Sequence, residues 1–209
     1  MARLKKPTEY INKLRLNPDL KAREIGENLR DKYQQWTRNL HLRDLLSFMQ
    51  SIQDNKNQIG TAQLFGKFRA YSLEEFVYRL IRAKLSISRS LEVYWGEKCL
   101  VWRGNGREYG MELDILVGRK LNQLVEPVVA IDTKVELDAS RLKTTLASFV
   151  LVKRWNLGMK CFLVYMIGET DPILLKLAEP WIDGIYEFGL ERDETEKLIE
   201  SIQEALSRF

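Results

Sequence analysis

The sequence predicts an α/β fold in which a mixed sheet is flanked by helices and preceded by an N-terminal helical segment. The first 58 or so residues have helical spacing and helix caps but contain no strand-like run. The polar, glycine-containing run DNKNQIGTAQ then interrupts that pattern. After it, the chain follows the order helix, three strands, helix, strand. We therefore expect a helical segment over residues 1–58 and a core domain over residues 59–209.

The elements of the core domain follow from local signals. Ser72 and Glu75 have the spacing of a capping box, which predicts a helix from there to about Ser88. The pair Asn105-Gly106 separates two apolar runs and predicts a hairpin turn. The strands are expected at CLVWR (99–103), the run through MELDILVG (111–118), VVAIDTKV (128–135) and KCFLVYMIG (160–168), with a long helix over 138–155 after the third strand and a C-terminal amphipathic helix over 191–209.

Composition excludes several classes of protein. Hydrophobic residues make up 45% and charged residues 30% of the 209, as in a folded globular protein. No apolar run has membrane-spanning length, and the N-terminus has no secretory apolar region, so we expect an intracellular protein, cytoplasmic or nucleoid-associated, with no membrane partner. Cys99 and Cys161 are too few for a disulfide framework and are expected to be reduced core thiols. His41 is the sole histidine, which argues against a histidine-based triad or metal site.

Charge is distributed unevenly along the chain. Residues 1–109 carry 21 Lys and Arg against 12 Asp and Glu, whereas residues 110–209 carry 12 against 17. A basic half favours a polyanionic partner, and nucleic acid is the commonest one. A solvated basic surface remains the alternative from charge alone.

The third predicted strand carries an acid and a base. Residues two apart in a strand share a face, so Asp132 and Lys134 lie side by side. On the preceding strand Glu112 and Asp114 fall on the face opposite its apolar residues, and Asp114 can meet Asp132 if the strands are neighbours. Two close carboxylates repel unless a cation lies between them, and Mg²⁺ suits such oxygen ligands. The alternative is a salt bridge on a half-exposed strand.

This arrangement resembles the PD-(D/E)XK nuclease superfamily, which includes restriction endonucleases, archaeal Holliday junction resolvases and RecB-type nucleases. The resemblance covers roughly residues 70–168 and rests on the order αβββαβ, with Asp114 on the second strand and Asp132-Thr133-Lys134 on the third. Gly110 to Leu113 precede Asp114 where the motif's name implies a proline. The resemblance implies a restriction-endonuclease-like αβββαβ core.

The resemblance also implies roles for individual residues. Asp114 and Asp132 would bind Mg²⁺, or Mn²⁺ in its place, helped by the carbonyl of Thr133, and Lys134 would position the attacking water. Many members add a glutamate from the first core helix. Glu74 is our choice for it, because Glu75 falls at the capping position.

We expect, on this basis, a Mg²⁺-dependent DNA endonuclease that is specific for a DNA structure or a DNA sequence. Arg141 and Lys143, at the start of the next helix, would contact the DNA backbone. A homodimer is expected, since cutting both strands of a symmetric target needs two sites. The alternative is a non-catalytic DNA-binding or assembly protein that keeps the fold. The N-terminal helices are expected either to contact DNA or form a dimer, or to be a simple amphipathic bundle.

Overall fold

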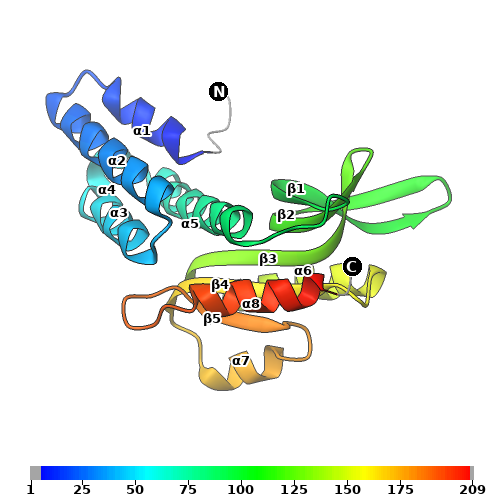
Figure 1. Cartoon of the computed structure of the whole chain (residues 1–209). Coiled ribbons are helices and arrows are strands. Elements are labelled where there is room, and N and C mark those ends of the chain that lie inside the picture. Colours follow the sequence, from blue (N-terminus) through cyan, green and yellow to red (C-terminus); the bar gives the residue numbers. More distant parts are fainter. Residues whose placement is uncertain (1–5, 208–209) are drawn as a thin grey trace. The chain divides into compact units, whose positions relative to one another are not determined.

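A computed structural model describes residues 6–207 of the chain (Figure 1). The chain divides into two compact units, Met1–Arg79 and Leu80–Phe209. The sequence-based boundary at residues 58 and 59 falls instead inside the first unit, in a short helix. In the part of the chain that the structure describes, no helix is long and apolar enough to cross a membrane.

The first unit is helical, as its sequence pattern predicts. Its core is aromatic: Trp36 packs edge-on against Phe76, and Phe48 does so against Phe68, while Tyr10 stacks on Phe68 with ring centroids 4.9 Å apart. Such pairs add to the apolar area that each ring removes from water. The helices are α1 (Pro7–Arg15), α2 (Leu20–Asn39), α3 (Leu42–Asp54), α4 (Lys56–Ile59) and α5 (Ala62–Lys84), of which α5 continues into the second unit.

The expected capping box at Ser72 is wrong. Helix α5 begins ten residues earlier, where the Thr61 hydroxyl accepts a hydrogen bond from the Leu64 amide at 3.3 Å. Ser72 lies inside the helix and donates its hydroxyl to the Phe68 carbonyl at 2.7 Å. A serine can satisfy its hydroxyl in this way within a helix, so the sequence spacing alone did not mark an end.

The second unit contains a five-stranded mixed sheet in the order β1-β2-β3-β4-β5. Strands β1, β2 and β3 form an antiparallel meander, whereas β4 and β5 add to β3 in parallel. The parallel step from β3 to β4 uses helix α6 as its crossover. The bounds are β1 (Glu92–Gly104), β2 (Arg107–Leu121), β3 (Leu124–Leu137), α6 (Ala139–Trp155), β4 (Lys160–Gly168), α7 (Pro172–Ala178), β5 (Gly184–Glu187) and α8 (Thr195–Leu206).

Two-residue turns connect the meander. The predicted turn at Asn105-Gly106 is confirmed, because both residues have positive φ, 49° and 72°, as a type I′ turn requires. The second turn is formed by Asn122, whose φ is 56°, and Gln123. The predicted strands ended at residue 118 and began at residue 128, but β2 runs to Leu121 and β3 begins at Leu124, so both strands reach the turn.

Helices cover both faces of the sheet. Residues Leu116, Ala130, Cys161 and Leu163 share one face and form a buried cluster with Leu142, Phe149 and Val152 of α6. Helix α8 packs on β3 and β5, and Figure 1 shows it in front of the sheet. Because β3 is covered on both sides, it is apolar over most of its length. The fold is therefore α/β, with a mixed sheet flanked by helices, as predicted.

The two cysteines are free and buried, which confirms that they are core thiols. Burial raises the pKa of Cys99 to about 11 and that of Cys161 to about 12. Both thiols are therefore protonated at neutral pH.

Candidate active site

Strand β3 places an acid and a base in a largely buried position. Asp132 is 7% exposed, next to Ile131, which is fully buried. Strand geometry directs Asp132 and Lys134 to the face covered by α6, while Ile131 points to the opposite face. An ionised carboxylate at such a depth requires partners that replace its water. The structure supplies two of them, the Lys134 ammonium from β3 and the Thr145 hydroxyl from α6.

Asp114 comes from the neighbouring strand β2. The regular pairing of β2 with β3 ends at Ile115 and Ile131, so the next position along each strand is Asp114 and Asp132. There the Asp114 carboxylate accepts hydrogen bonds from the Thr133 amide at 2.7 Å and from the Thr133 hydroxyl at 3.1 Å. A side chain thus takes the position of a main-chain acceptor at the point where the ladder stops. The structure brings Asp114 against the Asp132-Thr133-Lys134 segment.

Lys134 directs its ammonium back along β3. Its Nζ lies 2.6 Å from Oδ1 of Asp132 and 3.3 Å from the carbonyl oxygen of Thr133. The side chains of Lys134 and Asp132 are 21% and 10% exposed, so this ion pair is only partly open to solvent. The Lys134 ammonium is therefore held by one carboxylate oxygen and one main-chain oxygen. Asp114 is hydrogen-bonded to Thr133, the residue between Asp132 and Lys134.

Thr145 of α6 is a further member of the cluster that the sequence did not identify. Its hydroxyl donates a hydrogen bond to the second oxygen of Asp132, Oδ2, and the residue is 1% exposed. Thr145 lies on the buried face of α6 with Leu142, Phe149 and Val152. The sequence could have drawn attention to Thr145 as a threonine at a core position of an apolar helix face. It could not have identified Asp132 as the partner, because tertiary packing sets that contact.

These groups fit a hard divalent cation. Asp114, Asp132 and the Thr133 carbonyl are oxygen donors, and the lysine ammonium already lies between two of those oxygens. Mg²⁺ is commonly bound through one or two carboxylates and keeps several waters. Among residues 6–207 no group of three or more His, Cys, Asp or Glu side chains could hold a metal ion. The donor set here has two carboxylates and one main-chain oxygen.

Glu74 and Glu75 belong to helix α5 in the first unit, whereas the β2–β3 cluster belongs to the second. Glu74 is 9% exposed, and its membership of the site remains a prediction. Glu75 does not cap a helix. It accepts hydrogen bonds from the Tyr33 hydroxyl at 2.7 Å and from Arg79 at 2.8 Å. Burial first, and then the Glu75 carboxylate, raises the pKa of Tyr33, so the phenol remains protonated.

Arg141 and Lys143, the predicted DNA contacts, lie at the start of α6. Arg141 is 44% exposed and bonds to the segment that precedes its helix, with 3.0 Å to Asp138 Oδ2 and 3.2 Å to the Glu136 carbonyl. Lys143 is exposed. Arg141 would therefore have to exchange one acidic partner for a phosphate, whereas Lys143 projects into solvent.

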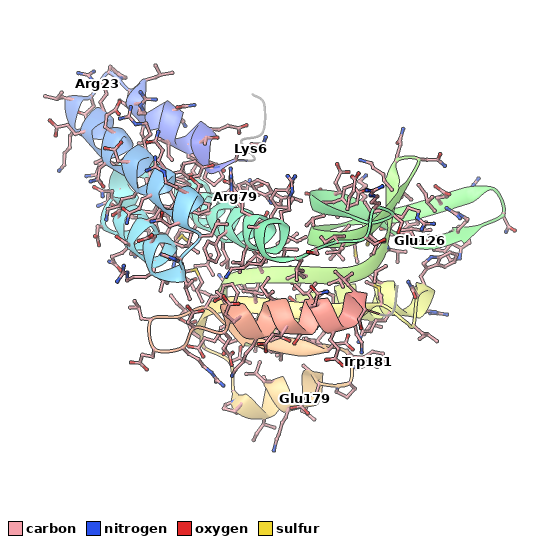
Figure 2. All side chains as sticks on the ribbon, viewed as in Figure 1. Lys6, Arg23, Arg79, Glu126, Glu179 and Trp181 are labelled. Atoms are coloured by element: carbon pink, nitrogen blue, oxygen red, sulfur yellow. The ribbon has the colours of Figure 1, made fainter. Side chains whose placement is uncertain are left out.

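Strand β4 places Tyr165 next to Lys134. The Tyr165 hydroxyl donates to Glu187 of β5 at 3.2 Å, and burial, together with that carboxylate, raises the pKa of Tyr165 to about 12. An open pocket of about 620 Å³ adjoins it, lined also by Glu179, which follows α7 in Figure 2, and by Glu194. Burial opposes ionisation of Glu194, but the Glu187 amide, Lys197 and Arg192 outweigh it and lower the pKa of Glu194. The Glu194 carboxylate therefore keeps its negative charge at the wall of this pocket.

Comparison with known proteins supports the fold. The sequence matches no protein-family model and no curated protein. Among solved structures, the chain is similar to one described as the native BbvCI A2B2 tetramer at low resolution, with a TM-score of 0.54 and 15% sequence identity over 96% of this chain and 94% of that one. BbvCI is a restriction endonuclease. At this identity the likeness concerns the fold, and the chain has a restriction-endonuclease-like fold.

Proposed function

We propose that the protein is a DNA endonuclease that depends on Mg²⁺, which Mn²⁺ can replace. One observation carries the proposal: the Lys134 ammonium lies between Asp132 Oδ1 and the Thr133 carbonyl, and Asp114 is bonded to that same segment. Two acids, a main-chain oxygen and a lysine are thus gathered at the end of a strand pair. The restriction-endonuclease-like fold supports the proposal at the level of architecture.

The groups divide into those that hold a cation and one that handles water. Asp114, Asp132 and the carbonyl of Thr133 would hold the divalent ion, and Thr145 would keep Asp132 in one orientation. A bound ion would polarise the scissile phosphate and stabilise the leaving oxygen. The Lys134 ammonium, displaced from the oxygens it now contacts, would orient the attacking water and stabilise negative charge on the phosphate.

Self-association is part of the proposal. One copy of the site cuts one strand, so a cut through both strands requires two copies or two successive events. The similar structure is described as an A2B2 tetramer, which concerns BbvCI itself. For this chain we propose a homodimer. Arg141 and Lys143 would contact the DNA backbone near each site.

The test is a cleavage assay on supercoiled plasmid and on a four-way junction, each with Mg²⁺, Mn²⁺ or EDTA. We expect cutting that depends on the metal. Asp132→Ala and Lys134→Ala should each reduce cutting by at least about a hundredfold, since each removes a group that stabilises the transition state. Both should still bind DNA in EDTA. Lys176→Ala is the matched control, because Lys176 is an exposed lysine on α7 and should leave cutting unchanged.

The rival is a non-catalytic DNA-binding or assembly protein in which Asp132 and Lys134 form only a structural ion pair. It predicts no metal-dependent cutting on any substrate while DNA binding persists. Full activity of either site variant would instead show that a different set of residues cuts the DNA.

A further inference from the structure

The β1–β2 hairpin exposes two aromatic rings opposite each other. Trp102 and Tyr109 are cross-strand partners in the register, and their exposed fractions are 46% and 61%. Rings of this size normally bury most of their apolar surface in a core or an interface. In Figure 1 the hairpin turn projects beyond the helices that cover the sheet.

The backbone holds Trp102 in a fixed orientation. The register between β1 and β2 shifts between Leu100 and Trp102, as at a β-bulge, and bulges redirect the side chains that follow. The indole then packs on the backbone of Gly104, where an added Cβ would lie 2.6 Å from the ring atom Cζ2. The type I′ turn at Asn105-Gly106 closes the hairpin immediately beyond. Trp102 is therefore exposed yet constrained, which reduces the entropy lost when it meets a partner.

A basic side chain shares the face of the two rings. Arg107 lies two residues before Tyr109 on β2 and opposite Gly104 in the register, so it is on the same face as Trp102 and Tyr109. Arg103 and Glu108 lie opposite each other on the other face and form a 2.8 Å ion pair. Exposed aromatic faces combined with basic side chains are the combination that binds bases and phosphates of unpaired nucleic acid.

We propose that the hairpin tip, defined as Trp102, Arg107 and Tyr109, binds DNA whose bases are unpaired or unstacked. The base faces of an intact duplex are covered by their neighbours, so a ring can stack only where the helix is opened. Trp102 and Tyr109 would stack on such bases while Arg107 contacts a flanking phosphate. The proposal rests on the proposed endonuclease function and narrows its substrate to DNA of distorted or partly single-stranded structure.

Binding is measured in EDTA, so that no cutting occurs, on a labelled duplex and on the same duplex with an internal unpaired bubble. We expect the wild-type protein to prefer the bubble. Trp102→Ala and Tyr109→Ala should each weaken bubble binding by about tenfold or more, the effect of losing one stacked base, and leave duplex binding nearly unchanged. A 2-aminopurine in the bubble should lose fluorescence on stacking with the wild-type protein and not with Trp102→Ala.

Controls separate stacking from folding and from assembly. Trp102→Tyr keeps an aromatic face and should retain most of the preference, and Trp181→Ala removes an equally exposed ring (45%) beside α7 and should change nothing. Equal losses on duplex and bubble, no loss on either, or an altered oligomer mass for Trp102→Ala would each overturn the proposal. Metal-dependent plasmid cutting is scored separately, so the endonuclease function can stand when stacking fails, and stacking can stand when cutting fails.

Discussion

Replacing Thr145 with valine tests whether α6 fixes the orientation of Asp132. Valine has nearly the shape of threonine, and the site is 1% exposed, so the change removes a hydroxyl and little else. Oδ2 of Asp132 then loses its donor, while Oδ1 retains Lys134. A hydrogen bond to a charged group contributes about 1.5–3 kcal/mol, and we expect a loss of about 2 kcal/mol in the free energy of unfolding. With a urea m-value of about 2 kcal/mol/M, the midpoint falls by about 1 M.

Urea unfolding followed by tryptophan fluorescence and circular dichroism measures this change, and coincident curves show that a single free energy applies. Thr144→Val is the matched control. Its hydroxyl donates to the Ser140 carbonyl on the exposed side of the same helix, so its effect should stay within about 0.5 kcal/mol. Thr145→Val should also raise the Mg²⁺ concentration needed for half-maximal cutting, which a loss of stability alone would not do. Equal midpoints for the two valine variants would refute the reasoning.

Two further predictions concern the packing of the sheet. Asp183 is bonded to Lys153 at 2.6 Å and to Lys160 at 2.8 Å; burial opposes its ionisation, but these lysines and the Cys161 amide outweigh burial and lower its pKa. Its stabilising effect is therefore present above the unfolded pKa of about 3.9 and is lost as the pH falls through the lower folded pKa. Asp183→Asn should reduce the free energy of unfolding at pH 7 by about 1–3 kcal/mol and make that free energy depend less steeply on pH in the acid range. Chemical denaturation between pH 7 and pH 3 measures both changes. Unchanged stability at pH 7 would contradict this prediction. Cys99 and Cys161 should resist a thiol reagent in the native protein at pH 8 and react on unfolding, because burial raises the pKa of both thiols and blocks access to them. Mass spectrometry counts the labelled thiols. Rapid labelling of the native protein would contradict their burial.

The sequence was sufficient where local chemistry decides the structure. Asn105-Gly106 encodes the type I′ turn through two left-handed positions. Asp138 caps α6 by accepting a hydrogen bond from the Arg141 amide at 2.8 Å, close to where the sequence predicted that a helix begins. The apolar run of 160–168 coincides with β4, and the period of two in β3 placed Asp132 and Lys134 on one face.

Non-local packing decided what the sequence could not. Ser72 is satisfied inside α5 because a helix partner, the Phe68 carbonyl, is available, so the expected helix start there was wrong. Residues Arg119 to Leu121 continue β2 because β3 pairs with them, although the predicted strand ended at residue 118. Thr145 reaches Asp132 across 13 residues of chain, and no pattern specifies that contact.

The meander has a consequence for the order in which the chain folds. Asp114, Asp132 and Lys134 lie on two strands joined by the two-residue turn at Asn122. Antiparallel pairing across so short a turn closes a small loop, whereas the parallel pairing of β3 with β4 must wait for the whole of α6. During synthesis, the two acids and the lysine can therefore come into register before β4 exists. In that order the acids and the lysine would meet first, and helix α6 would cover them afterwards.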